Sequence, residues 1–568
     1  MRTRSTLLAL TTAGGLSIAL ALPGAGAAHA AQGFGLTEVP SANARAAGLT
    51  TPNTLSPELA QVIRAQGSHR LENPRDGIGY YGYDSVANTP PLMPVGSTAE
   101  AHKTEPDKNT YLVLDGQTGP DATYDYGTHF LFQGHESGTP GYVTRVNLDA
   151  DAAHRVTLLA TRDQTRPLPD FDGSTYNPFT RTLMMTAESG CLSGTSDNLN
   201  AGVWQGDPSY AANAATSSFQ SLVGLFGRGG YEGIQTASDG SIWLVEDIGG
   251  KGVGSNGKAK LPNSFVYRFV PTDRADLAKG GVLQALQASD SAGPITFDTA
   301  NPFTTGMSEL HTYGTSFATR WVPIHDTATD GSAPFCAGDL AKAKLATPFK
   351  RPENGVFRPG TGFGEFFFTE TGDTDRTSPA NDSSKSTDSS VSNPDNAYGG
   401  LGGVFRLVQD GPSATTGTLT LAFKGDLAHT SLDNLAFVTK DQLAVVEDAG
   451  DTLHGQRNAL DSGFLLDLTQ ARPRALRFLA EGRDPSATLD SALGTTGNDG
   501  DNEVTGIHVS DGDPTASGLL GAKEPAPFTH GWRVFWTAQH GDNVTFEILP
   551  DPVAGPYVSG HGKGGNQD

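Results

Sequence analysis

Acidic residues recur at both ends of several predicted strand pairs. Each of these segments contains an acidic residue, a short apolar strand, a turn, a second apolar strand and a polar or acidic cluster. The segments are YEGIQTASDGSIWLVEDIGG (231–250), RPENGVFRPGTGFGEFFFTETGD (351–373), LDNLAFVTKDQLAVVEDAGD (432–451) and NEVTGIHVSDGDP…GWRVFWTAQHGD (502–542), with a weaker copy, FDGSTYNPFTRTLMMTAESG, at 171–190. Converging carboxylates repel one another, so each needs a nearby cation or acquires a raised pKa. The repeated pattern therefore predicts a cation site.

Strand pairing within the first segment brings its acidic residues to one end of a hairpin. If Asp239 and Gly240 form a two-residue turn, Glu232 lies opposite Asp247. Both strands of this hairpin then carry a carboxylate at the same rim.

Two further hairpins lead to the same arrangement. A turn in the middle of the third segment places Asp433 opposite Asp448, and one in the middle of the second places Glu353 opposite Glu370. A single acidic residue at a strand end more often faces water or caps a turn, so only the repetition at matched hairpin ends favours a shared site.

The predicted ring of ligands suits a hard cation. Calcium takes six to eight oxygen ligands at about 2.3–2.6 Å, and iron also accepts carboxylate and histidine ligands. His540 is the one histidine expected at an equivalent rim. The predicted metal ligands are Glu188, Glu232, Glu246, Glu353, Glu370, Asp433, Asn434 and Glu447.

The elements that must position these residues are short strands. Runs of β-branched and aromatic residues alternate with Gly, Asp and Asn turns, which is typical of an all-β protein. Helices are expected only around Pro57–Ala65, Ala275–Ala288 and Leu340–Leu345. Acidic strand pairs that recur with loop insertions favour a β-propeller, for which we expect six blades, with an N-terminal extension and surface insertions.

The chain divides into an export signal, an extension, one large domain and a tail. Residues 1–30 have a charged start, an apolar stretch and the small-x-small site Ala28-His29-Ala30, which predict a signal peptide and a secreted protein. Residues 31–106 form the extension. Residues 107–550 form the catalytic propeller, with insertions at 249–263 and 373–396, and residues 551–568 form a flexible tail.

Composition excludes several classes of function. The chain has 39 Lys and Arg against 62 Asp and Glu in 568 residues, a formal charge of −23, which excludes electrostatically driven nucleic-acid binding. No stretch is long and apolar enough to span a membrane. The two cysteines, Cys191 and Cys336, allow either one bridge or two free thiols, and no spacing suits structural zinc. A GxSxG serine nucleophile and a strand–GxxxxGK–helix nucleotide loop are both absent.

Four segments resemble the secreted alkaline phosphatase PhoX family, whose members are calcium- and iron-dependent six-bladed propellers. RPEN (351–354) resembles the family's RPE segment, LDNLAF (432–437) its DNLAF segment, NEVTGIHVSDGD…RVFWTAQHGD (502–542) its E-x-TG…FxxxQHPG stretch, and YEGI (231–234) its HEG-type strand start. Together these resemblances extend over about 170–545 of the chain.

The resemblance implies roles for several residues. Glu232 and Glu353 would be metal ligands, with the three residues Asp433, Asn434 and Glu447 near them, and Arg351 would hold the substrate phosphate. An arginine fork beside a cation cluster can bind a phosphoryl group through two hydrogen bonds.

One departure concerns the metal. In the family's TCEE-type segment a cysteine ligates iron, whereas the corresponding stretch here, LMMTAES (183–189), has Ala187 at that place and retains Glu188. Calcium binding through oxygen ligands alone does not depend on the missing thiolate. We therefore expect calcium, with iron as the less supported possibility.

These observations predict a secreted, monomeric, metal-dependent phosphatase for small phosphorylated substrates. A metal-activated water or oxo group would attack phosphorus, and Arg351 would hold the phosphate. Two alternatives stay open: a calcium propeller acting on another ester or a lactone, and a non-catalytic binding propeller stabilised by calcium.

Overall fold

The computed structural model describes most of the region expected to fold. The described residues are 35–45, 51–84, 102–137, 140–163, 165–191, 201–211, 218–381, 395–482, 503–540 and 543–553. The predicted signal peptide lies outside these residues, as do most of the tail and most of the insertion at 373–396.

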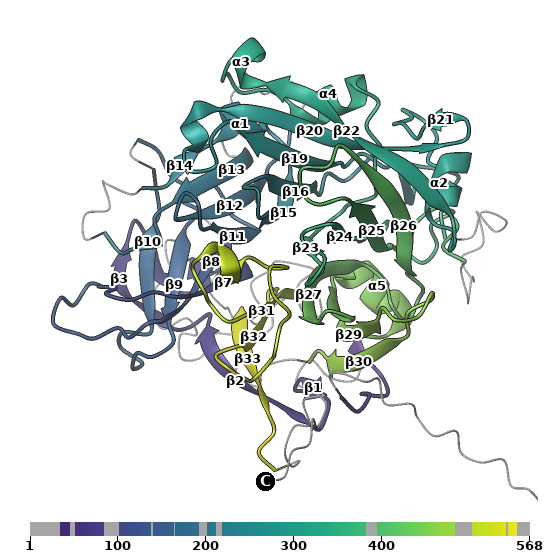
Figure 1. Cartoon of the computed structure of the whole chain (residues 1–568). Coiled ribbons are helices and arrows are strands. Elements are labelled where there is room, and N and C mark those ends of the chain that lie inside the picture. Colours follow the sequence, from purple (N-terminus) through teal and green to yellow (C-terminus); the bar gives the residue numbers. More distant parts are fainter. Residues whose placement is uncertain are drawn as a thin grey trace, which may run out of the picture.

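Antiparallel sheets surround a central axis (Figure 1). Within the described residues, five large sheets form this arrangement, and the edge strands β7, β11, β15, β23, β27 and β31 lie next to the axis. Each of these innermost strands contacts the next, so they form a closed ring. The predicted all-β, propeller-like fold is confirmed.

The strands of the first two sheets are as follows. The first sheet contains β7 (Pro106–Val113), β8 (His129–His135), β9 (Val143–Asn147) and β10 (Val156–Ala160), and the second contains β11 (Ser174–Asn177), β12 (Thr182–Glu188), β13 (Ala201–Gly206) and β14 (Gln220–Ser221).

A ten-stranded sheet follows, with β15 and β23 at its two ends. It contains β15 (Tyr231–Thr236), β16 (Ile242–Glu246), β19 (Val266–Pro271), β20 (Gly281–Asp290), β21 (Gly293–Pro294), β22 (Ser316–Asp326), β23 (Gly355–Phe357), β24 (Glu365–Glu370), β25 (Gly403–Gln409) and β26 (Thr416–Lys424).

The last two large sheets combine strands from both ends of the chain. One contains β27 (Leu432–Thr439), β28 (Gln442–Glu447), β29 (Ser462–Asp467), β30 (Ala475–Ala480) and β1 (Thr54–Leu55), and the other contains β31 (Val504–Ser510), β32 (Arg533–Ala538), β33 (Val544–Pro550) and β2 (Leu59–Gln66). N-terminal strands thus complete sheets begun by C-terminal ones.

The described residues also form smaller elements outside the five large sheets. They are the sheet of β3 (Arg70–Arg75), β4 (Ile78–Tyr80), β5 (Tyr83–Asp84) and β6 (His102–Lys103), the hairpin of β17 (Gly252–Val253) and β18 (Ala259–Lys260), the helices α1 (Val223–Phe226), α2 (Thr305–Leu310), α3 (Thr327–Asp330), α4 (Ala337–Ala343) and α5 (Gly450–Arg457), and the 3₁₀ turns Leu277–Lys279 and Ala516–Gly518. No helix in the described part of the chain is long and apolar enough to cross a membrane.

Two of the three predicted helices are strands. The segment Pro57–Ala65 contains β2, which pairs with β33, and Ala275–Ala288 contains most of β20, which pairs with β19 and β22. Pairing with distant strands satisfies the backbone of both segments and overrides their local helix preference. The helix predicted at Leu340–Leu345 is confirmed in part by α4.

The predicted hairpin registers are correct in one case and shifted in two. Gly355 lies opposite Phe368, as the pairing of Glu353 with Glu370 requires. In β15–β16 the turn has three residues instead of two, because Ala237 N donates to Ser241 O, and β-bulges shift the register of both β15 and β27.

Aromatic packing joins the hairpins that carry the acidic residues. The ring of Trp243 on β16 lies 5.0 Å from that of Phe357 on β23 and 4.9 Å from that of Phe366 on β24. All three side chains are buried in one hydrophobic cluster. Such burial stabilises by about 1.5–3 kcal/mol per large side chain and fixes the two hairpins relative to each other.

Candidate metal centre

Four innermost strands carry a β-bulge at the same level near the axis. The bulges of β7, β15 and β27 contain Asp107, Glu232 and Asp433, and that of β31 follows Thr505. A bulge bends its strand and changes the direction of a side chain. The repeated bulge therefore explains how strands from different sheets direct carboxylates toward one centre.

Two glycines allow these bulges to pack closely. A Cβ at Gly173 would lie 1.8 Å from the carbonyl oxygen of Glu232, and one at Gly233 would lie 2.9 Å from that of Glu353. Any larger residue would push neighbouring innermost strands apart. Asp172 and Glu232 are each followed by a glycine. At both places the first residue supplies a carboxylate, and the glycine lets the next innermost strand approach closely.

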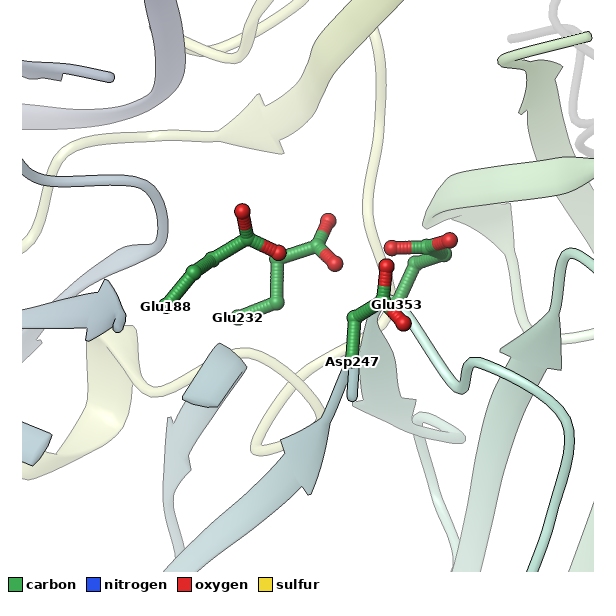
Figure 2. Close-up of side chains that lie close together, drawn as sticks. All are labelled: Glu188, Glu232, Asp247 and Glu353. Atoms are coloured by element: carbon green, nitrogen blue, oxygen red, sulfur yellow. The ribbon is translucent and has the colours of Figure 1, made fainter. Parts of the chain in front are cut away.

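The carboxylates form three overlapping groups. In each group the contributing oxygen atoms all lie within 4.8 Å of one another, and Figure 2 shows the side chains of the first group converging from different elements. The groups are Glu188, Glu232, Asp247 and Glu353; Asp107, Asp172 and Glu232; and Glu136, Asp172 and Glu188. Because the groups share members, they form one continuous acidic cluster.

Burial and mutual repulsion disfavour the charged forms in this cluster. Burial raises the pKa of Glu232 well above its usual range, and Asp172 and Glu353 raise it further. Burial also raises the pKa of Asp172 well above its usual range, and burial together with Asp247 raises that of Glu353 to about 7. A bound cation would reverse these shifts and release protons.

Several buried oxygens in this cluster have no hydrogen-bond partner among the described residues. They are both carboxylate oxygens of Asp172, Oδ2 of Asp107, Oε2 of Glu232 and, beside the cluster, the amide oxygen of Asn434. Buried acceptors without donors are costly unless a cation or water satisfies them. The donor set consists of oxygen atoms, so it fits a hard cation such as calcium.

Neither cysteine offers a thiolate to this cluster. Cys191 and Cys336 form a disulfide, so of the two alternatives left open by the sequence the bridge is the one observed. The bond ties the segment after Glu188 to the residue that precedes α4. Ala187 is buried in a hydrophobic cluster. Glu188, the next residue, is exposed to solvent and belongs to two of the three acidic groups.

Arg351 lies beside the cluster. Its guanidinium group is 2.8 Å from Asp247, 3.4 Å from Glu353 and 3.9 Å from Asp448. Its φ of 58° is in the left-handed region, which is unfavourable for a residue with a side chain and often occurs at functional sites. Arg351 is thus a partly exposed cation held beside the carboxylates.

Three predicted ligands lie outside the three groups. Glu246, Glu370 and Glu447 are the last residues of their strands, and each is buried among donors of its own. Glu246 accepts from Tyr267 Oη (2.8 Å) and Phe265 N (3.1 Å), Glu370 contacts His311 Nε2 (2.6 Å) and accepts from Lys350 N (2.6 Å), and Glu447 pairs with Arg457 (3.0 Å) and accepts from Thr430 N (2.9 Å). These carboxylates are satisfied by the protein itself.

Two other predicted ligands lie beside the cluster. The amide of Asn434 donates to both oxygens of Asp433 at 2.8 Å and to the hydroxyl of Thr505 at 2.9 Å. Burial raises the pKa of Asp433 well above its usual range, with further increases from Glu353 and Asp107. Asp433 therefore belongs to the same electrostatic environment without being a member of the three groups.

His540 contacts two carboxylates at the rim. Its Nδ1 lies 3.2 Å from Glu105 and its Nε2 lies 3.0 Å from Glu503. Burial opposes the charged form of His540, but the two carboxylates outweigh burial and raise its pKa well above the ordinary value. The two carboxylates therefore favour the protonated form of the ring.

Sequence reasoning missed several members of the cluster. Asp107 and Glu136 lie outside the repeated segments, and Asp172 lies in the weakest copy. Asp247 was placed at the hairpin end but left out of the ligand set in favour of Glu246. The signal that could have found Asp172 is the match of its Asp-Gly step to the Glu-Gly step at 232–233.

The fold and the site together define a propeller-like protein with clustered carboxylates beside an arginine. The chain belongs to the alkaline phosphatase PhoX family, whose sequence model matches residues 233–516, half of the chain. The matched region contains Arg351, Glu353 and Asp433, so the resemblance seen in the sequence is confirmed.

Solved structures include one with clear similarity in fold. Pseudomonas fluorescens PhoX in complex with vanadate, a transition state analogue, has a TM-score of 0.51 at 12% sequence identity, over 91% of this chain and 98% of that one. A gluconolactonase from Xanthomonas campestris (TM-score 0.30, 8% identity, 78% of this chain and 98% of that one) and an α-L-arabinofuranosidase from Podospora anserina (0.31, 7%, 79% and 92%) are too distant to bear on function. No curated protein shows significant sequence similarity to the chain.

Proposed function

We propose that the protein is a metal-dependent phosphatase that hydrolyses esters of phosphate. The observation that carries this proposal is the position of Arg351, which is partly exposed and lies within 4 Å of three carboxylates, two of them in the acidic cluster. Family membership supports hydrolysis of phosphoric esters. A guanidinium group beside bound cations favours a substrate with several anionic oxygens.

The carboxylates and Arg351 would have different roles. Glu188, Glu232, Asp247 and Glu353 would hold the cation, and calcium is the metal we propose. When bound, such cations would stabilise the negative charge that develops on phosphate oxygens. Arg351 would orient the phosphate through its N–H groups, and the exposed side chain of Glu188 marks the side open to solvent.

A second positively charged side chain, that of Lys260, supports an anionic substrate. The predicted insertion at 249–263 forms the β17–β18 hairpin, and the backbone N of Lys260 donates to Asp373 at 3.0 Å. Burial and the positive charge of Arg351 lower the pKa of Lys260, which indicates that the two cations are neighbours. Two cations favour a phosphate monoester, which carries more charge than a diester.

Several larger features complete the proposal. We propose six blades, with the ten-stranded sheet contributing two that are joined through β22. We also propose a signal peptide at residues 1–30, an extension at 31–106, a catalytic propeller at 107–550, a flexible tail at 551–568, secretion and a monomeric state. The disulfide is consistent with an oxidising compartment.

The test is hydrolysis of p-nitrophenyl phosphate by the purified mature protein. We expect turnover in excess calcium, loss of turnover with a chelator, and recovery when calcium is returned. Absence of turnover with both calcium and iron supplied would refute the proposal. Arg351→Ala should lower kcat/KM by at least about 10²-fold, with Arg406→Ala, which removes a surface arginine paired with Glu365, as the matched control.

One alternative has a specific observation in its favour. Because residue 187 is a buried alanine and both cysteines are bridged, the chain lacks the thiolate ligand of its family. A non-catalytic propeller stabilised by calcium would lose thermal stability on chelation and hydrolyse neither phosphate esters nor other esters or lactones.

A further inference from the structure

A buried lysine lies beside the acidic cluster. Lys108 is only 2% exposed and occupies the bulge of β7, directly after Asp107. Its ammonium group donates a hydrogen bond to the side-chain oxygen of Asn354, which precedes β23. Between β7 and β23 the ring of innermost strands contains β11 and β15 on one side and β27 and β31 on the other, so the Lys108 side chain spans the central axis.

The surroundings of Lys108 are strongly negative. Its ammonium group interacts electrostatically with Asp107, Asp433, Asp172 and Glu232. Among the described residues it forms no close ion pair, and Asn354 is its only hydrogen-bond acceptor. A buried ammonium that has four carboxylates around it and none in contact offsets part of the negative charge of the whole group.

The same carboxylates include one of the three candidate metal groups. Asp107, Asp172 and Glu232 lie within reach of a single ion, and Asp172 has no hydrogen-bond partner among the described residues for either oxygen. An ammonium and a divalent ion repel each other strongly at short distance in a buried environment. One of the two must therefore dominate at this position.

We propose that Lys108 is a built-in cation that replaces a divalent ion in the group of Asp107, Asp172 and Glu232. The metal ions of the protein then bind in the two groups that contain Glu188. Lys108 has two advantages over an ion. Its charge is attached to the chain, and Asn354 fixes its position from the opposite side of the axis.

This inference rests on the proposed metal centre and limits the number of ions that the centre binds. The lysine lowers the number of ions that the protein binds, since part of the negative charge of the innermost group is already offset before any ion binds. Burial lowers the pKa of Lys108, and the four carboxylates oppose that decrease.

The test is the metal content of a charge-removing variant. In Lys108→Met, calcium titration and elemental analysis should show one more ion per chain than in the full-length mature protein, or at least about tenfold tighter binding of the weakest ion. Lys108→Arg, which keeps the charge, should bind as many ions as the wild type. Lys440→Met removes an exposed lysine and controls for the loss of one positive charge.

The outcomes separate this inference from the proposed function. A folded Lys108→Met variant with unchanged stoichiometry and affinity overturns the role of Lys108, even if the protein is an active phosphatase. A wild-type protein that binds no divalent ion overturns the proposed function instead, and a gain of one ion in Lys108→Met still supports the lysine. If the variant does not fold, anomalous diffraction from wild-type crystals soaked in manganese decides: an ion bound by Asp107, Asp172 and Glu232 overturns the inference, and its absence there with ions at Glu188 supports it.

Discussion

The hairpin ends contain two kinds of acidic residue, one position apart. Glu246 and Glu447 end their strands and accept hydrogen bonds from donors within the protein. Asp247 and Asp448, the next residues, lie beside Arg351, and Asp247 is also in the acidic cluster. Successive side chains of a strand point to opposite faces, so one step separates a carboxylate that stabilises the fold from one that faces the axis. Glu246 and Glu447 are buried with donors of their own, whereas Asp247 and Asp448 are partly exposed beside Arg351.

The largest expected effect is on Glu232, one of the three carboxylates that belong to two groups. Glu232→Gln should lower kcat/KM for p-nitrophenyl phosphate by at least about 10³-fold, because this residue belongs to the group with Glu188, Asp247 and Glu353 that would hold the cation. The fold should persist in chelator, since removing one charge relieves repulsion. Activity close to that of the wild type would show that the cluster is not the catalytic centre.

A change in Glu447, a carboxylate with hydrogen-bond donors of its own, should affect stability and not metal binding. Glu447→Gln leaves the guanidinium of Arg457 with a weaker partner in a buried site. The free energy of unfolding in chelator should fall by about 3 kcal/mol, measured by denaturant titration, while calcium stoichiometry stays that of the wild type. A lost calcium ion in this variant would place Glu447 among the ligands and contradict a purely structural role for this carboxylate.

Removing calcium should lower the stability of the protein only through the carboxylates near the axis. Calcium at about 100 times its Kd should raise the free energy of unfolding by about 2.7 kcal/mol over the chelated protein. Scanning calorimetry with and without calcium measures this difference. Glu232→Gln should show a smaller calcium effect, and Glu447→Gln should keep the full one. An identical Tm in calcium and in chelator would contradict a cation site.

The smallest expected effect is the pH dependence of the metal-free protein. The pKa of Glu353 is raised from 4.5 to about 7, so the folded state binds more protons than the unfolded state between these values. Stability from this group is therefore present below pH 4.5, falls by up to about 1.4 kcal/mol per pH unit as the pH rises to 7, and changes no further above it. Thermal melts from pH 5 to 8 in chelator test this trend, and Glu353→Gln should flatten it.

The sequence predicted the general site better than its members. Repeated acidic hairpins indicated an all-β propeller, and motifs around Arg351 and Asp433 indicated the family. Of the predicted ligands, the structure brings the oxygens of Glu188, Glu232 and Glu353 together. The choice of Glu246 over Asp247 depended on register, which a three-residue turn and a bulge changed.

The sequence by itself determined the alternation of apolar and polar residues, the excess of acidic side chains and the turns, because these are properties of neighbouring residues. Only the tertiary structure decided which carboxylates meet, which of them obtain donors, and that Lys108 lies among them. Those outcomes depend on contacts between strands far apart in the chain and on single-residue bulges that no local pattern specifies.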